Sequence, residues 1–294
     1  MAHRLSVLIF GLLVLSCIGA IATGFSDLSG PYLGQEPPGL EPVPFAERLI
    51  AFTHSSLSMS PDGTEIYWAD RTEGPMASQI VCTRNLGDEW SEPAQVFPNS
   101  ISQSDCPVIS PDGQKMFFNS IHPLIPGERE RERLWVSERT EDGWGDPTPL
   151  ADVVNAFGLH WQCAVDADGH LYFGATPPTG GSDDDIYVAR WIEGSFLTAT
   201  RMEISTTLDE ATPFIDPAGE YFLLSRIDGQ SGYIAASFRE DDGSWTEPVV
   251  LDLGDVEFPV CPYVSPDGKY LFVLSWPKVY WVDAQIIEAG RPLR

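Results

Sequence analysis

Side chains that could bind a ligand or a metal stand shortly before each of five similar turns. They are His54, Asp105, His160 followed by Trp161, Glu210 and Glu257. Carboxylates and imidazoles can hold a divalent cation or hydrogen-bond a polar ligand. If the five turns bring these residues to one place, they predict a ligand-binding site, with His54, His160 and Glu210 as the candidates for a cation. The alternative is that they cap strand ends and bind water.

Three cysteines occupy similar positions in the same segments. Cys106 and Cys261 stand four residues before their turns, and Cys163 stands three residues before its own. A zinc site with His54 or His160 is one interpretation, but the sequence has no C-x-x-C pair of the kind typical of zinc sites. We favour buried free thiols that pack as small apolar groups.

Most familiar catalytic motifs are absent from the sequence. It contains no G-x-S-x-G, no H-E-x-x-H and no glycine-rich phosphate loop. Two of Asp105, Glu210 and Glu257 could serve glycoside hydrolysis if their carboxyl groups lay about 5 to 10 Å apart. The sequence leaves enzymatic activity open and favours a protein that is not an enzyme.

The turns themselves are the strongest signal in the sequence. Four-residue segments of the type Ser-Pro-Asp-Gly recur at 60–63, 110–113, 166–169, 216–219 and 265–268, with spacings of 50, 56, 50 and 49 residues. Proline presets φ, aspartate can bond the local backbone, and glycine accepts positive φ, so each segment predicts a tight hairpin turn. A period of this length predicts a propeller or another repeat array.

Each repeat predicts four strands. Apolar and aromatic runs follow the turns at 66–68, 116–118, 171–173, 221–224 and 270–274. Third strands are expected at 79–83, 134–138, 186–190, 233–237 and 279–283. Trp-x-x-Pro segments at 90–93, 144–147 and 245–248 suit outer edge strands, where proline's missing N–H costs little, and Phe196 marks a looser copy. Four strands per repeat is a propeller blade.

The last repeat lacks an outer strand, and residues 41–48 resemble one. Pairing this segment with the last blade would close the ring and cover both edges. We therefore predict an all-β chain with one five-bladed propeller over residues 41–294 and an N-terminal extension at 23–40. A six-bladed ring is the alternative, but it would need a further blade before Ile50.

These repeats resemble the TolB-type, WD40-like β-propeller family. The resemblance spans roughly residues 30–294 and is carried by the Ser-Pro-Asp-Gly turns, by GPYLGQEPPG at 30–39, by CPYVSPDGKYLF at 261–272 and by VYWVDAQIIE at 279–288. It implies a propeller of an exported bacterial group and no catalytic residue. The turns at 166–169 and 216–219 depart from the pattern, which leaves their hairpin type open.

The first residues indicate export. Residues 1–22 combine a basic start, an apolar run and small residues, as in a signal peptide. Cleavage after Ala22 competes with lipoprotein processing at Cys17, so the chain is expected in the periplasm or outside the cell, with a lipid anchor as the alternative. In such compartments Cys82, Cys106, Cys163 and Cys261 could pair in three ways.

The charge of the chain limits its partners. The formal net charge is −26, which opposes binding to nucleic acid or to anionic lipid. No segment is long and apolar enough for a membrane span. The sequence favours an exported, monomeric binding scaffold that holds a protein, peptide or glycan at the channel mouth, without a confidently assigned cofactor. A carbohydrate-active hydrolase or lyase is the alternative.

Overall fold

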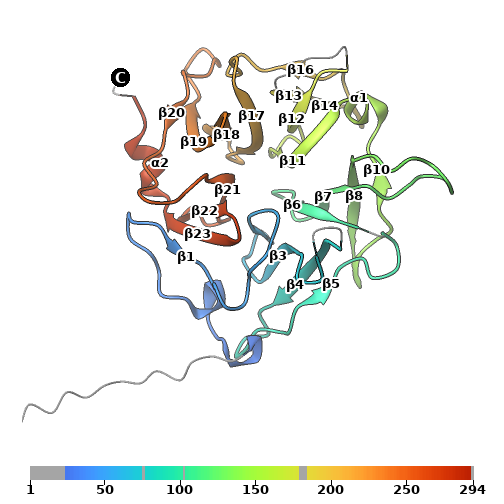
Figure 1. Ribbon diagram of the computed structural model, residues 1–294, viewed down its shortest axis with the longest axis vertical. Helices are drawn as coiled ribbons and strands as arrows, with labels where there is room; N and C mark the ends of the chain where they lie inside the picture. The colour runs from blue at the N-terminus through green and yellow to red at the C-terminus, as the bar shows by residue number, and fades with distance from the viewer. Residues whose placement is uncertain (1–23, 75–76, 102, 179–183, 293–294) are drawn as a thin grey trace, which may run out of the picture.

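Five antiparallel sheets, four with four strands and one with five, surround a central axis in the computed structural model (Figure 1). The structure describes residues 24–292 except 75–76, 102 and 179–183, and the side chains of residues 159–161 are also outside the description. The predicted signal segment and Cys17 lie outside the described residues. The predicted all-β, five-bladed propeller is confirmed, and the six-bladed alternative is wrong for the described chain.

The four strand positions of a blade follow the repeat. The innermost strands are β2 (Ser58–Met59), β6 (Asp105–Ile109), β11 (Gly158–Val165), β17 (Asp209–Ile215) and β21 (Val260–Val264). The second strands are β3 (Glu65–Asp70), β7 (Lys115–Ser120), β12 (Leu171–Thr176), β18 (Tyr221–Asp228) and β22 (Tyr270–Ser275). The third strands are β4 (Gln79–Arg84), β8 (Arg133–Thr140), β13 (Asp185–Ala189), β19 (Ser231–Phe238) and β23 (Lys278–Asp283).

The outer strands are short. They are β5 (Ala94–Gln95), β10 (Thr148–Pro149), β16 (Thr200–Arg201), β20 (Val249–Val250) and, in the last blade, the N-terminal β1 (Val43–Pro44). The Trp-x-x-Pro segments thus come just before the paired residues rather than forming the strands themselves. At β5, for example, Val81 pairs with Gln95 and Cys82 with Ala94, and both partners follow Pro93 in the sequence.

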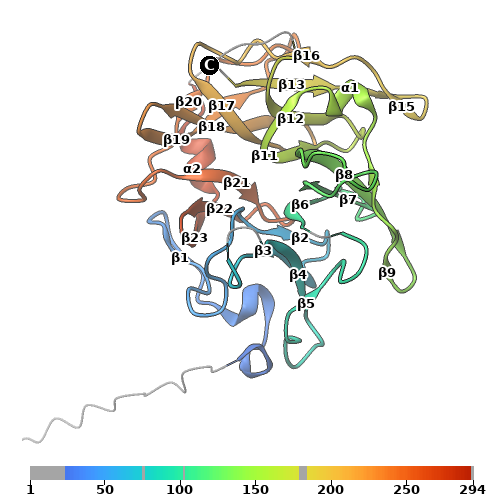
Figure 2. The same ribbon diagram turned by 45° about the vertical axis from the view of Figure 1, so that its right-hand side comes forward.

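The N-terminal strand closes the ring as predicted. Val43 pairs with Trp281 and Pro44 with Tyr280, so β1 completes the blade of β21, β22 and β23 (Figure 2). The preceding extension forms two short 3-10 turns, η1 (Phe25–Asp27) and η2 (Pro31–Gly34), whose apolar residues pack into the core shared with the first blade.

Few elements lie outside the blades. They are two short helices, α1 (Asp152–Asn155) and α2 (Gln285–Ala289), a small hairpin of β14 (Trp191–Ile192) and β15 (Ser195–Phe196), and β9 (Gly143–Trp144), which extends β8. No helix among the described residues has the length and apolar character needed to cross a membrane.

All five turns share one geometry, including the two that depart from Ser-Pro-Asp-Gly. In every turn the glycine has positive φ, between 71° and 80°, and its N–H donates to the carbonyl three residues earlier at 2.7–3.0 Å. Where serine is first, as at Ser60, its hydroxyl accepts from the backbone two residues after the glycine, at 2.9 Å. Asp166 and Asp216 replace serine and accept instead from the backbone N–H directly after the glycine, at 2.9 and 3.2 Å. In the first turn Asp62 accepts from that position, at the N–H of Thr64, so a carboxylate oxygen stabilises the turn in either case.

Four inner strands carry a β-bulge at the same depth. The register shifts between Asp105 and Val108 in β6, and at corresponding places in β11, β17 and β21. Cys106, Thr212 and Cys261 have positive φ there, of 51°, 42° and 54°. Bulges bend a strand and redirect its side chains. Here they separate the two ends of the central channel. The end around His54 and Asp105, where the inner strands begin, is the strand-start mouth, and the end formed by the five turns is the turn mouth.

Candidate functional site

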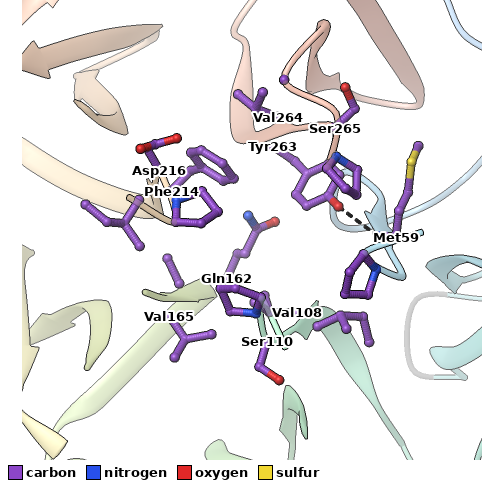
Figure 3. A pocket seen from close by; sticks show the side chains of 18 of the residues that line it. Met59, Val108, Ser110, Gln162, Val165, Phe214, Asp216, Tyr263, Val264 and Ser265 are labelled. Atoms are coloured by element: carbon purple, nitrogen blue, oxygen red, sulfur yellow. Dashed lines mark hydrogen bonds between the residues drawn. The ribbon is translucent and has the colours of Figure 1, made fainter. Parts of the chain in front are cut away.

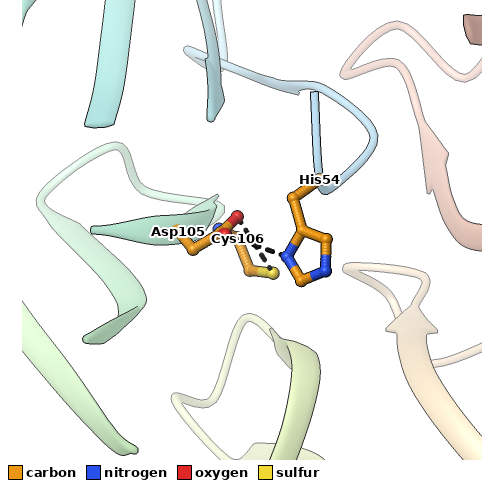
Figure 4. A group of neighbouring side chains, drawn as sticks. All are labelled: His54, Asp105 and Cys106. Atoms are coloured by element: carbon orange, nitrogen blue, oxygen red, sulfur yellow. Dashed lines mark hydrogen bonds and ion pairs between the residues drawn. The ribbon is translucent and has the colours of Figure 1, made fainter. Parts of the chain in front are cut away.

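Asp105 is the centre of a polar cluster at the strand-start mouth (Figure 4). Its Oδ2 accepts hydrogen bonds from His54 Nδ1 at 2.9 Å, from Arg71 Nη2 at 2.7 Å and from the Ser78 hydroxyl at 3.0 Å. Its Oδ1 accepts from the backbone N–H of Cys106 at 2.8 Å. The cluster joins the first two blades, because His54 precedes β2, Arg71 and Ser78 lie between β3 and β4, and Asp105 begins β6.

The surroundings of Asp105 favour its ionised form. Burial opposes ionisation, but the hydrogen bond and charge of His54 together with the Arg71 charge outweigh it, so the pKa of Asp105 is lowered. The neighbouring Cys106 shows the opposite effect. Burial and the negative charge of Asp105 raise the pKa of its thiol well above the ordinary value, so Cys106 is held as a neutral thiol.

The same residues form a candidate metal cluster. Ligand atoms of His54, Asp105 and Cys106 lie within 4.8 Å of one another, and histidine, carboxylate and thiolate are all zinc ligands. The fit is poor, because Arg71 and Ser78 already donate to Asp105 Oδ2. A metal would stand beside the Arg71 guanidinium and would require an unfavourable Cys106 thiolate. A divalent cation therefore remains a prediction that this geometry does not favour.

Glu132 is a member of this mouth that sequence reasoning did not find. Its Oε1 accepts from Asn119 Nδ2 at 2.9 Å, and Asn119 is the register partner of Asp105. The residue as a whole is solvent-exposed, and its carboxyl group lies against Asn119 and within the influence of the Asp105 charge. Burial by the surrounding protein, opposed by the Asn119 bond and aided by the Asp105 charge, raises its pKa to about 7. The residue sits in an alternating Glu-Arg run, which in sequence looks like an ordinary exposed loop.

Two predicted carboxylates do not join the cluster. Glu210 is fully buried, with Oε1 accepting from Arg226 Nε at 2.9 Å and from the Thr206 hydroxyl at 2.6 Å. It therefore holds strand β17 to β18 and is not presented to the channel. Glu257 is exposed in the loop before β21. Within the described chain, its carboxylate forms no hydrogen bond or ion pair with the Asp105 cluster.

His160 and Trp161 can be placed only by their backbone. His160 lies in β11 opposite Gly174, at the edge of the β11 bulge. The side chains of both residues lie outside the described part of the structure, so their predicted role stays a prediction.

Exposed aromatic side chains border the strand-start mouth. Phe52, two residues before His54, is 50% exposed and meets the 66% exposed Trp276 edge to face, with ring centroids 6.3 Å apart. Phe258, which leads into β21, is 41% exposed. Exposed aromatic groups beside a polar cluster are typical of binding surfaces.

The turn mouth contains a cavity of about 270 Å³ on the axis (Figure 3). Every inner strand contributes at least one large side chain to its wall, among them Met59, Val108, Val165, Phe214 and Tyr263. Gln162 closes its inner end. The sequence contained a signal for Gln162, since it stands four residues before its turn, at the position of Cys106 and Cys261.

The four described cysteines are free. Cys82, Cys106, Cys163 and Cys261 are buried and form no disulfide. This agrees with the expected packing of Cys106, Cys163 and Cys261 as small apolar side chains, and none of the three candidate pairings is formed.

Comparisons with known proteins identify the fold. No protein-family model and no curated protein sequence matches the chain. TolB from Agrobacterium tumefaciens is similar in structure, with a TM-score of 0.52 and 18% identity, over 78% of this chain and 70% of that one. An α-L-arabinofuranosidase from Lactobacillus brevis has a TM-score of 0.51 and 12% identity, over 86% and 88% of the two chains. At these identities the likeness shows a TolB-like β-propeller fold alone.

Proposed function

We propose that this chain is an exported, non-catalytic binding propeller of the TolB type that docks a protein partner at the strand-start mouth. The observation that carries the proposal is the exposed aromatic group of Phe52, Trp276 and Phe258 beside the Asp105 cluster. Aromatic and arginine side chains dominate binding energy at protein interfaces. Arg71 and His54 lie in the same mouth and retain partial exposure, with 18% and 29% of their side chains accessible.

The bonding of the carboxylates supports binding rather than glycoside hydrolysis. A glycosidase needs one carboxyl group to act as an acid and another to act as a nucleophile or base. Asp105 accepts five hydrogen bonds from the protein, counting the long one from the Cys106 thiol, and Glu210 is buried in its ion pair with Arg226. Both carboxylates are therefore engaged in bonds within the protein. Of the three predicted carboxylates, only Glu257 is exposed, whereas glycoside hydrolysis needs two.

Photo-crosslinking in the producing cell tests the docking surface. A photoreactive phenylalanine analogue at Trp276 should give one defined crosslinked partner, and the same analogue at Leu86 should not. Leu86 is the matched control, because it is 60% exposed and lies in the β4–β5 connection, at the opposite end of the blade. Co-purification of that partner should be lost in the double variant Phe52→Ala/Trp276→Ala and kept in Leu86→Ala. Equal crosslinking at both positions, or co-purification that survives the double variant, would contradict the proposal.

An activity assay tests the non-catalytic part. We expect no release of reducing ends from a panel of polysaccharides. Turnover that disappears in Glu257→Gln or Asp105→Asn, with the variant still folded, would favour the carbohydrate-active alternative. If the bound partner proves to be a glycan, the proposed protein partner is wrong but the proposed binding site is right.

The export part has a separate test. The mass of the chain recovered from the cell envelope should correspond to a start at Thr23 or to a lipidated Cys17. An intact chain starting at Met1 and recovered from the cytoplasm would overturn export and leave the docking surface untouched.

A further inference from the structure

The axial cavity at the turn mouth is a built site, separate from the docking surface. Its wall is apolar and is contributed by every blade, through Met59, Val108, Val165, Phe214 and Tyr263. At about 270 Å³ it is close to the lower limit of known small-molecule pockets, which begin at roughly 300 Å³. The cavity therefore suits a small apolar body or a single side chain.

Gln162 presents an unused hydrogen-bond acceptor to this cavity. The residue is 3% exposed, and its Nε2 donates to the carbonyl of Pro262 at 3.2 Å. Because a carbonyl oxygen can only accept, this bond fixes the orientation of the amide. The Oε1 atom then has no hydrogen-bond partner among the described residues, and Figure 3 shows the amide in the middle of the ring of lining side chains. An acceptor that faces the cavity without a protein donor favours a ligand that donates a hydrogen bond.

Asp216 gives the cavity a negative border. It lines the cavity, and its Oδ2 accepts from the backbone N–H groups of Ala218 and Glu220 at 3.0 and 3.2 Å. Within the described chain, Oδ1 has no partner and no cation pairs with the carboxylate. Burial is the main cause that raises the pKa of Asp216, and the two backbone bonds offset it only in part. The other turns place Asp62, Asp112, Asp168 and Asp267 at the same mouth.

We propose that this cavity binds a primary ammonium group carried on a small apolar body. The ammonium donates to Gln162 Oε1, the carboxylate of Asp216 and the negative turn mouth attract its charge, and the apolar body fills the space between the inner strands. Clefts lined by one sign of charge with apolar walls concentrate ions of the opposite sign. A free amine and the N-terminal ammonium of a peptide share this chemistry.

Calorimetric titration of the whole chain with matched probes tests the site. We expect 2-phenylethylamine to bind at least about tenfold more tightly than 2-phenylethanol, equivalent to roughly 1.4 kcal/mol, and 3-phenylpropionate not to bind. A Phe-Gly-Gly peptide with a free N-terminus, compared with its acetylated form, separates the two sources. Tight binding of the free peptide indicates a peptide N-terminus, whereas binding of the amine alone indicates a small molecule.

Variants locate the binding. Asp216→Asn keeps an oxygen for the two backbone donors and should weaken amine binding. Asp228→Asn, at an exposed aspartate that ends β18 on the side away from the turns, should not. Val108→Phe should abolish binding by filling the cavity, and Trp276→Ala at the other mouth should leave it unchanged. Absence of amine binding, equal binding of the amine and the alcohol, or amine binding that survives Val108→Phe in a folded protein would overturn the proposal. Because the docking surface lies at the opposite mouth, that result would not affect the proposed function.

Discussion

Phe45 and Trp281 pack edge to face with ring centroids 5.0 Å apart, although they come from opposite ends of the chain. Phe45 is fully buried, and its N–H donates to the carbonyl of Val279 at 2.8 Å. This contact continues the pairing of β1 with β23 and joins the first and last parts of the ring. A propeller closed in this way buries edges that would otherwise be exposed.

Removing the Phe45 ring should therefore weaken the whole ring. We expect Phe45→Ala to lower the free energy of unfolding by about 3 to 5 kcal/mol, because a buried aromatic side chain leaves a cavity. Val43→Ala, two residues earlier in β1 but 39% exposed, should change it by less than about 0.5 kcal/mol. Urea unfolding followed by tryptophan fluorescence measures both. Similar small effects of the two changes would show that closure adds little stability.

The repeat explains why the fold could be predicted and the channel could not. Turn residues and apolar runs recur in sequence, so the five blades and the closing strand at residues 41–48 followed from local patterns. The full membership of the polar cluster does not follow from local patterns, because Arg71 and Glu132 come from loops without a repeated motif. Only in the folded ring does Arg71 bind Asp105 and does Glu132 come within the influence of its charge. The sequence predicts Glu210 as a channel residue, but its carboxylate is bound by Arg226, its register partner on β18.

The Glu210–Arg226 pair should matter for stability. Glu210→Leu leaves a buried guanidinium without its carboxylate, and we expect a loss of about 3 to 5 kcal/mol in the free energy of unfolding. The double variant Glu210→Leu/Arg226→Met should recover most of that loss, since an apolar pair can replace a buried ion pair. A double-mutant cycle in urea measures the coupling. If the two losses simply add, the pair is not the cause.

Acid should weaken the cluster around Asp105. Its pKa is lowered in the folded protein, so its contribution to stability is complete above the ordinary carboxyl pKa of 3.8 and is lost as the pH falls through the folded value. Asp105→Asn should be less stable than the native chain at neutral pH, and the difference should shrink below about pH 4. Asp88→Asn, at an exposed position, is the control and should show no such convergence. A gap that stays constant with pH would mean that the charge of Asp105 is not responsible.

Glu132 should have the opposite pH dependence. Its folded pKa is raised to about 7, so its contribution to stability is complete below the ordinary glutamate pKa and is lost as the pH rises through about 7. Glu132→Gln should therefore gain stability relative to the native chain between pH 5 and 8, approximately over the interval between the unfolded and folded pKa values. Thermal unfolding at several pH values measures this. Parallel curves for the two proteins would show that Glu132 titrates as an ordinary exposed carboxyl.

We expect the four described cysteines to be inaccessible free thiols rather than disulfides. Burial is the main cause that raises the pKa of Cys82, Cys163 and Cys261 to about 12, and a protonated thiol is a poor nucleophile. In a Cys17→Ser background we expect the native chain to react very slowly with a thiol reagent, and the denatured, unreduced chain to release four thiols, matching the four free cysteines. The comparison separates two causes of low reactivity, because burial is removed by denaturation and a disulfide is not. Two missing thiols after denaturation would indicate one disulfide, and chain movement would then be needed to bring two of the buried sulfur atoms together.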